Sequence, residues 1–403
     1  MSEMSRHYDE YRLEELGDLK NGLNFTNSEI KTPCKIIGVG DFGNNIFPPY
    51  DQLGYVDKNN VSEDFLLKEN DIIFVRSNGN KNLVGRTMMI KNIQEDVTFS
   101  GFCIRLRIDS KIVNPEYLFY ALRAPFCRKQ YSYSQQTNIT NLSQDVLSNV
   151  IVRLPSLQEQ EKIAMILLNI DKKIVNNHTI NDNLEQMANQ LYEYWFIQFQ
   201  FPNNDNNPYK LSGSPMVYNS LLKIEIPEGW RVKTVASLLD KVPNTLRVQN
   251  AEYKSSGNIP IVNQSASLIA GYTDNTDALL SDEHGYIVFG DHTRVVKYIR
   301  FPFARGADGT QILKSSLSCM PTELLYHTIT HIDLSNQGYA RHFKFLKDSL
   351  VIVPNDDIAQ KFAVQVSIWH EQQKQLLFEN MKLSKLRDWL LPMLMNGQAT
   401  IDD

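Results

Sequence analysis

The sequence has few cysteines and no long apolar run. Only four cysteines occur among 403 residues, and the cysteines are Cys34, Cys103, Cys127 and Cys319. No two of them form a CxxC pair, which argues against a zinc knuckle or a disulfide framework and favours reduced, mostly buried thiols. No run of about 18 apolar residues occurs, and the N-terminal segment lacks the apolar core of a secretion signal. We therefore expect a cytoplasmic protein that does not span a membrane.

Excess charge of one sign is also absent. Lys and Arg total 41 against 46 Asp and Glu, which gives a net charge of -5. A mildly acidic chain has no global attraction to nucleic acid or to an anionic membrane, so contact with a polyanion requires a local basic surface. Hydrophobic residues make up 42% of the chain and charged residues 22%. This composition excludes a disordered or collagen-like protein and indicates about two to four domains.

A long helical pattern occurs twice in the sequence. The first copy opens at Ser156 and Glu159, whose S-x-x-E spacing is that of a capping box. Apolar residues then recur alternately every fourth and third position, as in the seam of two packed helices. The pattern recurs about 200 residues later, and this copy ends at Leu391-Pro392 and Asn396-Gly397, a proline stop and a helix-closing glycine. The seam positions are Leu167, Ile170, Ile174, Asn177, Asn181, Leu184, Ala188, Leu191 and Trp195, then Phe362, Val366, Trp369, Gln373, Leu376, Asn380, Leu383, Arg387, Leu390 and Leu394.

Polar residues lie inside this seam. Asn177, Asn181, Gln373 and Asn380 would be unusual in a dry core, whereas polar groups in the seam of a helix pair fix its register. A pattern of about 40 residues makes a helix of roughly 60 Å, longer than one domain needs. We therefore predict that the two long helices pair with each other. The alternative is that each helix packs only on its own domain.

A mixed α and β segment precedes each long helix. Both segments show, in chain order, a buried strand, a polar and basic stretch, a short helix and a last strand that leads into the long helix. These parts lie at residues 71–75, 76–81, 117–122 and 150–152, and again at residues 285–289, 290–294, 323–328 and 350–353. Residues 202–215 are rich in Pro, Asn, Ser and Gly and form a connector. The predicted fold class is α+β, a tandem of two globular domains and two long helices.

A cofactor loop is one interpretation of residues 38–43, which match G-x-G-x-x-G after a short apolar run. Asp57 lies at a suitable distance in sequence for a ribose contact. Such a site needs a helix that opens at the third glycine, but Pro48 and Pro49 follow closely and prevent one. A glycine-rich turn is the favoured interpretation.

Two further enzyme motifs are weak. Phe47-Pro48-Pro49-Tyr50 resembles the (Asn/Asp/Ser)-Pro-Pro-(Tyr/Phe) signature of amino-methyltransferases, but a phenyl ring offers no acceptor for the target amino group. His284, Asp291 and His292 cluster around one predicted strand, but no second ligand pair accompanies them, so His292 is interpreted as a hydrogen-bonding surface group. The sequence contains no G-x-S-x-G elbow, Walker loop or H-E-x-x-H motif.

The polar and basic stretches fit DNA. Arg, Asn and Ser form paired contacts with guanine or adenine edges or bond phosphates. A single stretch of this kind would favour a solvated loop. Here a polar and basic stretch follows a buried strand at matching places in both halves, and this repetition favours DNA binding. Residues 338–347 interleave cations with aromatics, and residues 131–138 occupy the region of the first half that corresponds to residues 336–342. The predicted DNA-binding residues are Arg76, Ser77, Asn78, Asn80, Lys81, Arg86, His292, Thr293, Arg294, Lys297, Arg305, Arg341, His342 and Lys344.

In this order the motifs resemble the DNA-specificity subunits of type I restriction-modification systems, over nearly the whole chain. The motifs that carry the resemblance are Leu154-Pro155 with Glu159-Gln160, residues 184–201, Pro208-Tyr209-Lys210 with Ser212-Gly213 and Met216-Val217-Tyr218, Ile226-Pro227-Glu228-Gly229-Trp230, Gly290-Asp291-His292-Thr293-Arg294 with Asp308-Gly309-Thr310, and Leu386-Arg387-Asp388 with Leu391-Pro392. The second long helix lacks the glutamate of the capping box at residues 354–357.

This resemblance implies two target-recognition domains, each reading one half of a split, asymmetric DNA site, held apart by the long helices in an antiparallel coiled coil with pseudo-twofold symmetry. It implies a subunit without catalytic residues, cofactor or metal, which directs methylation and cleavage by partner subunits. The implied partners are two adenine-N6 methyltransferase subunits, which use S-adenosylmethionine, and translocating nuclease subunits, which use ATP and Mg. Because the chain is acidic, its affinity for DNA alone is expected to be modest, and tight binding requires a basic partner.

The predicted boundaries follow from these parts. Residues 1–153 and 227–353 are the two target-recognition domains, residues 154–200 and 354–397 are the long helices, residues 201–226 are the connector, and residues 398–403 are a tail. The alternative function, motivated by residues 38–43 and 47–50, is a self-contained adenine-N6 DNA methyltransferase. A scaffold that pairs helices without touching DNA also remains open.

Overall fold

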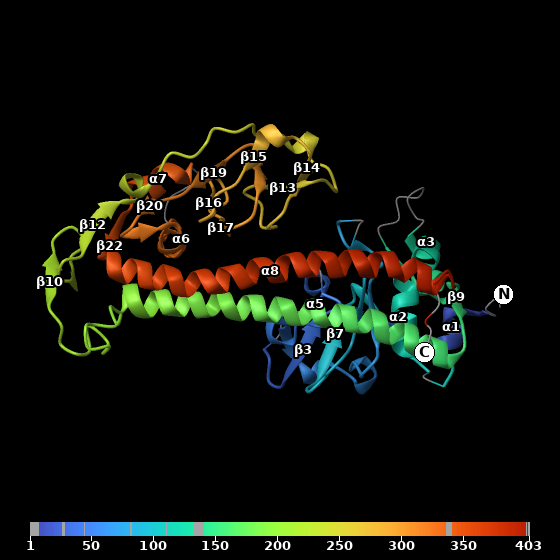
Figure 1. Ribbon diagram of the computed structural model, residues 1–403. Coiled ribbons are helices and arrows are strands. Elements are labelled where there is room, and N and C mark those ends of the chain that lie inside the picture. The colour runs from blue at the N-terminus through green and yellow to red at the C-terminus, as the bar shows by residue number, and fades with distance from the viewer. Residues whose placement is uncertain are drawn as a thin grey trace. The chain divides into compact units, whose positions relative to one another are not determined.

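The computed structural model describes residues 8–25, 29–43, 45–80, 83–109, 111–132, 141–335, 341–399 and 401. The chain forms two compact units: unit 1 consists of residues 1–176 and 380–403, and unit 2 consists of residues 177–379. Two long helices, α5 (Leu157–Tyr192) and α8 (Asp356–Met395), each have residues in both units (Figure 1). Within the described part of the chain, no helix combines the length and apolar character that crossing a membrane requires.

Unit 1 contains two small sheets. The first has the strand order β2–β8–β5–β6, and the second has the order β4–β3–β7, in which β3 and β7 are parallel. These strands are β2 (Gly17–Asn21), β3 (Pro33–Ile37), β4 (Gly54–Asp57), β5 (Ile72–Val75), β6 (Thr87–Met89), β7 (Val97–Phe99) and β8 (Cys103–Ile108). The central strand β5 is buried on both faces, with Ile72 and Phe74 in the core around helix α2 (Pro115–Arg123) and Ile73 and Val75 in a second core. Burial on both faces explains the continuous apolar run of this strand.

Unit 2 repeats this topology. Its sheets have the orders β17–β16–β19 and β14–β13–β18–β15, and β13 and β18 are parallel. The strands are β13 (Ile259–Val262), β14 (Gly271–Thr273), β15 (Leu279–Leu280), β16 (Tyr286–Gly290), β17 (Val296–Ile299), β18 (Phe303–Arg305) and β19 (Thr310–Leu313), followed by helix α6 (Thr322–Thr330). The register also repeats, since Val75 lies opposite Cys103 in unit 1 and Gly290 lies opposite Thr310 in unit 2. The predicted α+β tandem is confirmed.

An antiparallel strand pair leads into each long helix. In unit 1, β1 (Asp9–Arg12) pairs with β9 (Ile151–Leu154), and in unit 2, β12 (Arg231–Thr234) pairs with β22 (Leu350–Val353). The remaining elements are α1 (Leu13–Leu16), α3 (Pro125–Ser132), α4 (Gln144–Ser148), α7 (His342–Asp348), β10 (Met216–Asn219), β11 (Ile224–Pro227), β20 (Ser316–Leu317), β21 (Met320–Pro321), the π-helical turn η7 (Glu193–Ile197) and the short 3-10 helices η1 (Val39–Asp41), η2 (Tyr50–Gln52), η3 (Lys58–Asn60), η4 (Glu63–Phe65), η8 (Val235–Leu238), η9 (Asn250–Glu252) and η10 (Thr276–Ala278). The short β9 and β22 therefore join each domain directly to a long helix.

The ends of the long helices match the sequence only in part. Ser156 Oγ accepts from Glu159 N at 3.4 Å, as the capping spacing predicts. The second helix has a cap that the sequence reading missed, since Asn355 Oδ1 accepts from Ile358 N at 3.2 Å. The predicted proline stop is wrong, because α8 continues through Pro392 to Met395. The proline removes one backbone hydrogen bond, but Leu394 and Met395 are buried in the core of unit 1 and hold the last turn.

In unit 1 the two long helices pack together through polar contacts. Arg387 Nη1 on α8 donates to Asp171 Oδ1 on α5 at 2.7 Å. Closer to the middle of each helix, Asn380 Nδ2 donates to Ile174 O at 3.4 Å. Asp171 is almost fully buried and also accepts from Tyr120 Oη of α2 at 2.7 Å. This carboxylate therefore joins both long helices to the domain.

Unit 2 continues the same pairing. Asn177 Nδ2 on α5 donates to Glu379 Oε2 on α8 at 2.7 Å. Gln373 Nε2 donates to Asn181 O at 3.3 Å and to Glu185 Oε2 at 3.1 Å. Residue numbers rise along α5 as they fall along α8, so the helices are antiparallel, and the prediction that they pair with each other is confirmed. The polar seam residues make the contacts that fix the register.

A buried histidine pair joins the long helices to α6 in unit 2. His327 on α6 and His370 on α8 face each other, with their Nε2 atoms 3.3 Å apart. Asn189 of α5 lies 3.1 Å from His327 Nδ1, and Gln373 Oε1 lies 2.9 Å from His370 Nδ1. Because Asn189 Oδ1 and Gln373 Oε1 can only accept hydrogen bonds, each ring donates from its Nδ1. Burial lowers the pKa of both histidines, which favours neutral rings.

The pair makes the stability of unit 2 sensitive to acid. Above about pH 7 both rings are neutral in the folded and unfolded chain, so their contribution is constant. Below about pH 6.5 the unfolded chain binds protons that the folded pair resists, so the free energy of unfolding falls by up to about 1.4 kcal/mol per pH unit for each histidine. We expect His370→Gln to show a smaller loss between pH 7.5 and 5.5 than the wild type in urea titrations. His178→Gln, at an exposed histidine of α5, is the matched control and should keep the wild-type slope. Equal slopes in all three proteins would refute this assignment.

Candidate nucleic-acid interface

Loops from both sheets meet at one edge of each domain. In unit 1 these are residues 38–43 after β3, residues 76–80 after β5, and residues 100–102 between β7 and β8; in unit 2 they are residues 263–268, 291–295 and 306–309. We call each set the strand-end site of its unit. The parallel pairs β3–β7 and β13–β18 bring their carboxyl ends to this edge. Brought together in this way, the loops form one surface in each unit.

The two strand-end sites share a backbone arrangement. In unit 1, Arg76 N donates to Phe102 O at 2.8 Å, and Arg76 O accepts from Leu142 N at 2.8 Å. In unit 2, Asp291 N donates to Gly309 O at 2.7 Å, and Asp291 O accepts from His342 N at 2.9 Å. Arg76 and Asp291 therefore occupy equivalent positions. The two basic stretches that the sequence singled out lie at equivalent places in the two units.

In unit 1, arginine side chains hold the neighbouring loops. Arg76 Nη1 donates to Gly101 O at 3.3 Å, and Arg86 Nη1 donates to Gly43 O. Asn78 Oδ1 accepts from Asn80 N at 2.8 Å, which closes a tight turn. Ser77 forms an isolated bridge with Asn141. The structure thus brings together Arg76, Ser77, Asn78, Asn80 and Arg86, whereas Lys81 and residues 133–138 lie outside the described residues.

The glycine-rich residues 38–43 belong to this site but do not form a cofactor loop. Residues Val39–Asp41 form a short 3-10 helix, and Gly38 N donates to Asp41 Oδ2 at 2.7 Å. A phosphate-binding loop directs its N–H groups at the ligand, whereas this one is already bonded to a carboxylate. The Phe47–Tyr50 segment is likewise anchored, because Tyr50 Oη donates to Lys91 O at 2.9 Å. Both observations favour structural loops.

In unit 2, Gln264 connects all three loops of the strand-end site. Its Oε1 accepts from His292 N at 3.2 Å, its backbone oxygen accepts from Thr293 Oγ1 at 2.7 Å, and its Nε2 donates to Asp308 O at 3.0 Å. The sequence reading missed this residue, because Gln264 lies in a polar loop without a motif. Its position directly after a strand of the parallel pair is the one signal that points to it.

The exposed side chains of this site include three of the predicted ones. His292, Thr293 and Arg294 lie on the surface. Arg294 has a left-handed backbone with φ of 60°, and its Nη1 donates to Leu334 O at 3.2 Å. Arg341 and Lys344 are also exposed, at and just after the start of α7. Residues 338–340 lie outside the described residues.

Two predicted contacts do not lie on the surface. Lys297 is 7% exposed and its Nζ donates to Asn263 O at 2.9 Å, and also to Ser267 O. Burial lowers the pKa of Lys297 to about 8. His342 is 5% exposed, because it begins a helix that is held against Asp291. These residues support the loops and do not face solvent, so the prediction that they contact DNA is corrected.

Arg305 and Asp291 also serve the loops. Arg305 is half-buried and its Nε donates to Thr310 O at 2.9 Å; burial lowers its pKa to about 10. The buried Asp291 carboxylate accepts from Phe343 N at 2.8 Å and so caps α7. The Asp291 carboxylate therefore has a structural role at the start of α7. Among the described residues, no group of three or more potential metal ligands occurs.

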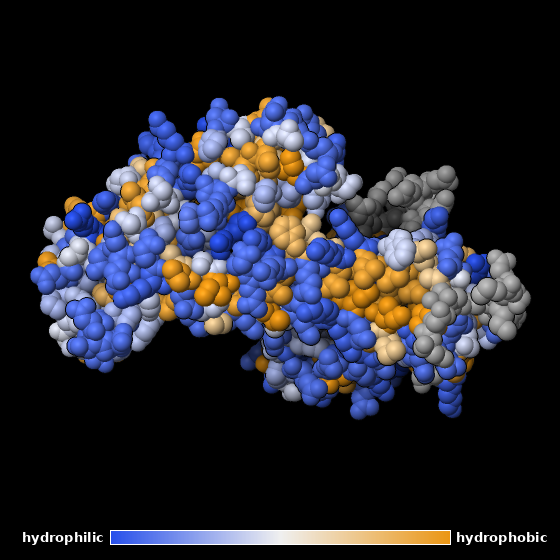
Figure 2. All heavy atoms as spheres, viewed as in Figure 1, coloured by the Kyte–Doolittle hydropathy of each residue, from blue (hydrophilic) through white to orange (hydrophobic). Residues whose placement is uncertain are grey.

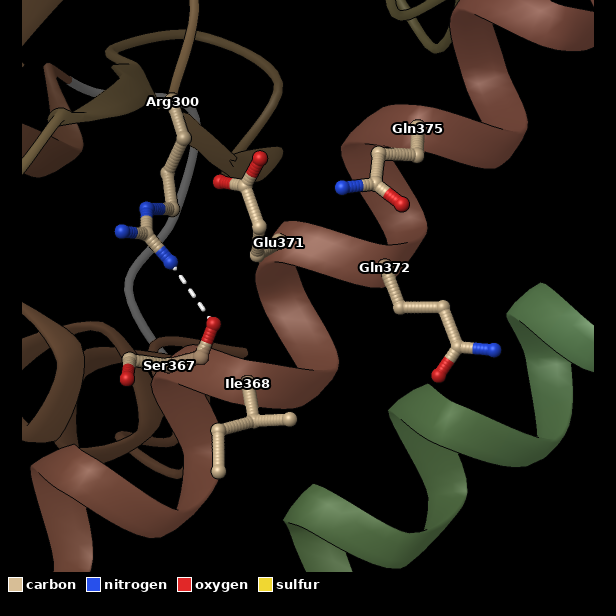
Figure 3. A pocket seen from close by; sticks show the side chains of 6 residues that line it. All are labelled: Arg300, Ser367, Ile368, Glu371, Gln372 and Gln375. Atoms are coloured by element: carbon tan, nitrogen blue, oxygen red, sulfur yellow. Dashed lines mark hydrogen bonds between the residues drawn. The ribbon is translucent and has the colours of Figure 1, made fainter.

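A separate groove lies on α8 in unit 2. It has a volume of about 550 Å³ and is lined by Arg300, Ser367, Ile368, Glu371, Gln372 and Gln375 (Figure 3). Arg300 Nη1 donates to Ser367 O at 2.8 Å, so this arginine is bound to the long helix. The groove shares no residue with the strand-end site, and none of the predicted DNA-binding residues lines it.

Comparison with known proteins identifies a common family among the matches. Residues 6–186 match the family model described as the type I restriction modification DNA specificity domain. The type I restriction enzyme MjaIX specificity subunit of Methanocaldococcus jannaschii is 26% identical over 316 residues, which are 72% of this chain and 70% of the relative. The StySPI specificity subunit of Salmonella potsdam is 30% identical over 141 residues, 34% of this chain and 30% of the relative.

A solved structure shares the fold. The crystal structure of the type I restriction-modification system S subunit from M. genitalium has a TM-score of 0.58 and 15% sequence identity, and the match covers 98% of this chain and 97% of that chain. At this identity the likeness concerns the fold alone.

The hydrogen bonds of Gln264 predict a measurable effect on its loop. In Gln264→Ala we expect the His292 amide to exchange with deuterium roughly five- to tenfold faster, since a typical hydrogen bond contributes about 1 kcal/mol. Amides of the central strand β16 in the same protein should exchange at the wild-type rate. Gln311→Ala, which removes an amide from β19, is the matched control. Equal exchange of the His292 amide in both variants would show that Gln264 does not hold the loop.

Proposed function

We propose that the chain is a member of the family of type I restriction-modification DNA specificity subunits, whose model matches residues 6–186, and that each strand-end site reads one half of a bipartite, asymmetric DNA sequence. The chain is a specificity subunit, the non-catalytic DNA-recognition component of a restriction-modification complex. A self-contained methyltransferase is not favoured. This agrees with the bonded Gly38 amide of the glycine-rich turn.

One observation carries the proposal of two half-sites. The strand-end sites share a backbone arrangement but present unlike side chains, Ser77 and Asn78 in unit 1 where unit 2 has His292 and Thr293. Base edges in the major groove are told apart by their donor and acceptor patterns. Equivalent loops with different donors and acceptors therefore read different bases, and a site read in this way is asymmetric.

The chemistry of the exposed residues suits base and phosphate contacts. Arginine forms paired hydrogen bonds with guanine, asparagine with adenine, and serine or threonine with either bases or phosphates. Arg86 and Arg294 each use one guanidinium nitrogen on a loop carbonyl, and a guanidinium has five N–H donors. Anchoring through one nitrogen orders the side chain before binding, which lowers the entropy cost of a contact with DNA.

We also propose partners for the chain. Two adenine-N6 methyltransferase subunits that bind S-adenosylmethionine, and nuclease subunits that use ATP and Mg, would supply the catalysis. Exposed apolar side chains on the long helices support this proposal, and they include Met165, Ile180, Met187, Val364, Ile368 and Trp389. Figure 2 shows orange surface in separate groups along the path of α8. Large apolar side chains in contiguous exposed groups are typical of surfaces that other proteins cover.

We further propose that the helix pair determines the number of base pairs between the half-sites. Seven residues inserted after Asn176 in α5 and seven after Glu379 in α8 add about 10 Å to each helix while keeping the seam in phase. We expect the preferred spacer to lengthen by about three base pairs, as measured by selection from random DNA with the assembled complex. Seven residues inserted after Asp205, in the connector, should leave the spacer unchanged. An unchanged spacer in the double insertion would exclude the proposal.

Arg294→Ala tests base readout by unit 2. We expect recognition to relax at one or two positions of one half-site, because an arginine contact to a base discriminates by about 1–3 kcal/mol. Mapping methylated adenines in a genome that expresses the variant with its partner methyltransferase measures this effect. Arg294→Gly should relax recognition in the same way as Arg294→Ala, because glycine readily adopts the φ of 60° found at this position. Lys223→Ala is the matched control, an exposed cation with φ of 58°. A uniform loss on every sequence would instead identify a phosphate contact.

A further inference from the structure

An exposed aromatic ring lies in the strand-end site of unit 1. Phe102, in the turn between β7 and β8, is 59% exposed, and no other phenylalanine stands among the exposed large hydrophobic residues of the described chain. The phenylalanines of unit 1 at Phe74, Phe99 and Phe119 are buried in its cores. The Phe102 ring therefore contributes little to the folding of the domain.

The backbone under this ring is held from several sides. Phe102 O accepts from Arg76 N at 2.8 Å and from Ser77 N at 3.4 Å, and Cys103 N donates to Ser100 O at 2.9 Å. Gly101 N donates to Leu23 O at 2.7 Å. The turn is thus fixed by residues of two neighbouring segments while its aromatic side chain remains in solvent. An ordered backbone presents the ring at a low entropy cost of binding.

Gly101 lies next to the ring and packs against Asn24. A Cβ atom at position 101 would lie 2.1 Å from Asn24 Oδ1, so a larger residue fits only if the Asn24 side chain moves. Arg76 Nη1 donates to Gly101 O at 3.3 Å and places a guanidinium group at the same turn. The ring, the guanidinium of Arg76 and the hydroxyl-bearing Ser77 therefore belong to one constrained surface.

The equivalent position of unit 2 differs in chemistry. Gly309 accepts from Asp291 N as Phe102 accepts from Arg76 N, and Gly309 has φ of 69° and no side chain. A Cβ atom there would lie 2.7 Å from His292 Cδ2 and 2.8 Å from Gln264 Nε2. Polar side chains thus crowd the Gly309 position of unit 2, and no apolar ring extends from it.

We propose that the Phe102 ring packs against the C5 methyl group of a thymine in the half-site that unit 1 reads. The thymine methyl is the one apolar feature that bases present in the major groove, and phenylalanine is among the side chains that contact it. Phe102 is then a specificity-determining residue of unit 1, whereas unit 2 has hydrogen-bonding groups at the same place. This inference rests on the proposed function, and it names a base and a contact atom for one of the two sites.

Replacement of thymine by deoxyuridine tests the contact, because deoxyuridine pairs like thymine but lacks the methyl group. The assembled complex with its partner methyltransferase is titrated with duplexes in which each thymine of the half-site is replaced in turn. We expect wild-type affinity to fall roughly three- to tenfold at one thymine, as for the loss of one buried methyl contact. Phe102→Ala should bind the unmodified duplex more weakly by a similar factor and should not respond to deoxyuridine at that position.

Two variants serve as controls. Phe102→Leu keeps an apolar side chain and should retain part of the response to deoxyuridine. Ile112→Ala removes a 38% exposed apolar side chain beyond the opposite end of β8, and should keep the full wild-type response. The half-site of unit 1 is identified as the one that Arg294→Ala leaves unchanged.

The outcomes separate this inference from the proposed function. If the wild-type complex shows no preference for a bipartite sequence, the proposed function fails. If it shows that preference but Phe102→Ala responds to every deoxyuridine as the wild type does, only the role of Phe102 is excluded. A half-site without thymine excludes it as well. An equal loss of affinity for all sequences in Phe102→Ala would identify a wedge between bases or a structural role, and would also overturn the inference.

Discussion

The register of the long helices depends on a few buried and partly buried polar groups that lie between them. Asp171 with Arg387 in unit 1, and Glu185 with Gln373 in unit 2, meet only in one antiparallel alignment of α5 and α8. A slip by one helical turn, about 5.4 Å, would separate these partners and cost about 1–3 kcal/mol for each buried group. Apolar seam residues discriminate less, because one aliphatic side chain can replace another. The polar contacts therefore determine the alignment, and β9 and β22 run from the domains directly into the aligned helices.

The same carboxylates also attach each domain to the helices. Tyr120 of α2 donates to Asp171 at 2.7 Å, and Tyr326 of α6 donates to Glu185 at 3.0 Å. A domain cannot move along the helices without breaking the contacts that set their register. The two attachments differ in chemistry. That of unit 1 uses an arginine and an aspartate, whereas that of unit 2 includes the His327–His370 pair, whose protonation burial opposes.

The strand-end sites separate the groups that shape a loop from the groups that face solvent. Backbone hydrogen bonds and buried side chains such as Lys297 and Asp291 hold the loops. Exposed side chains such as His292 and Phe102 contribute little to that support through their outer atoms. Under the proposed function, a change of the exposed residues would alter which bases are bound while the hydrogen bonds that hold the loops stay the same.

Local patterns in the sequence determined the long helices, the strands at residues 71–75 and 285–289, and the tandem order, because periodicity and capping depend on residues near in the chain. Polar seam residues such as Asn177 also predicted that the two long helices pair with each other. Tertiary structure alone decided that Lys297 and His342 are buried and that α8 passes through Pro392. It also decided that Gln264, Phe102 and the glycine-rich turn join the strand-end sites. The physical reason is that burial, and the meeting of loops far apart in sequence, depend on how strands pair across the sheet, and no local pattern encodes that pairing.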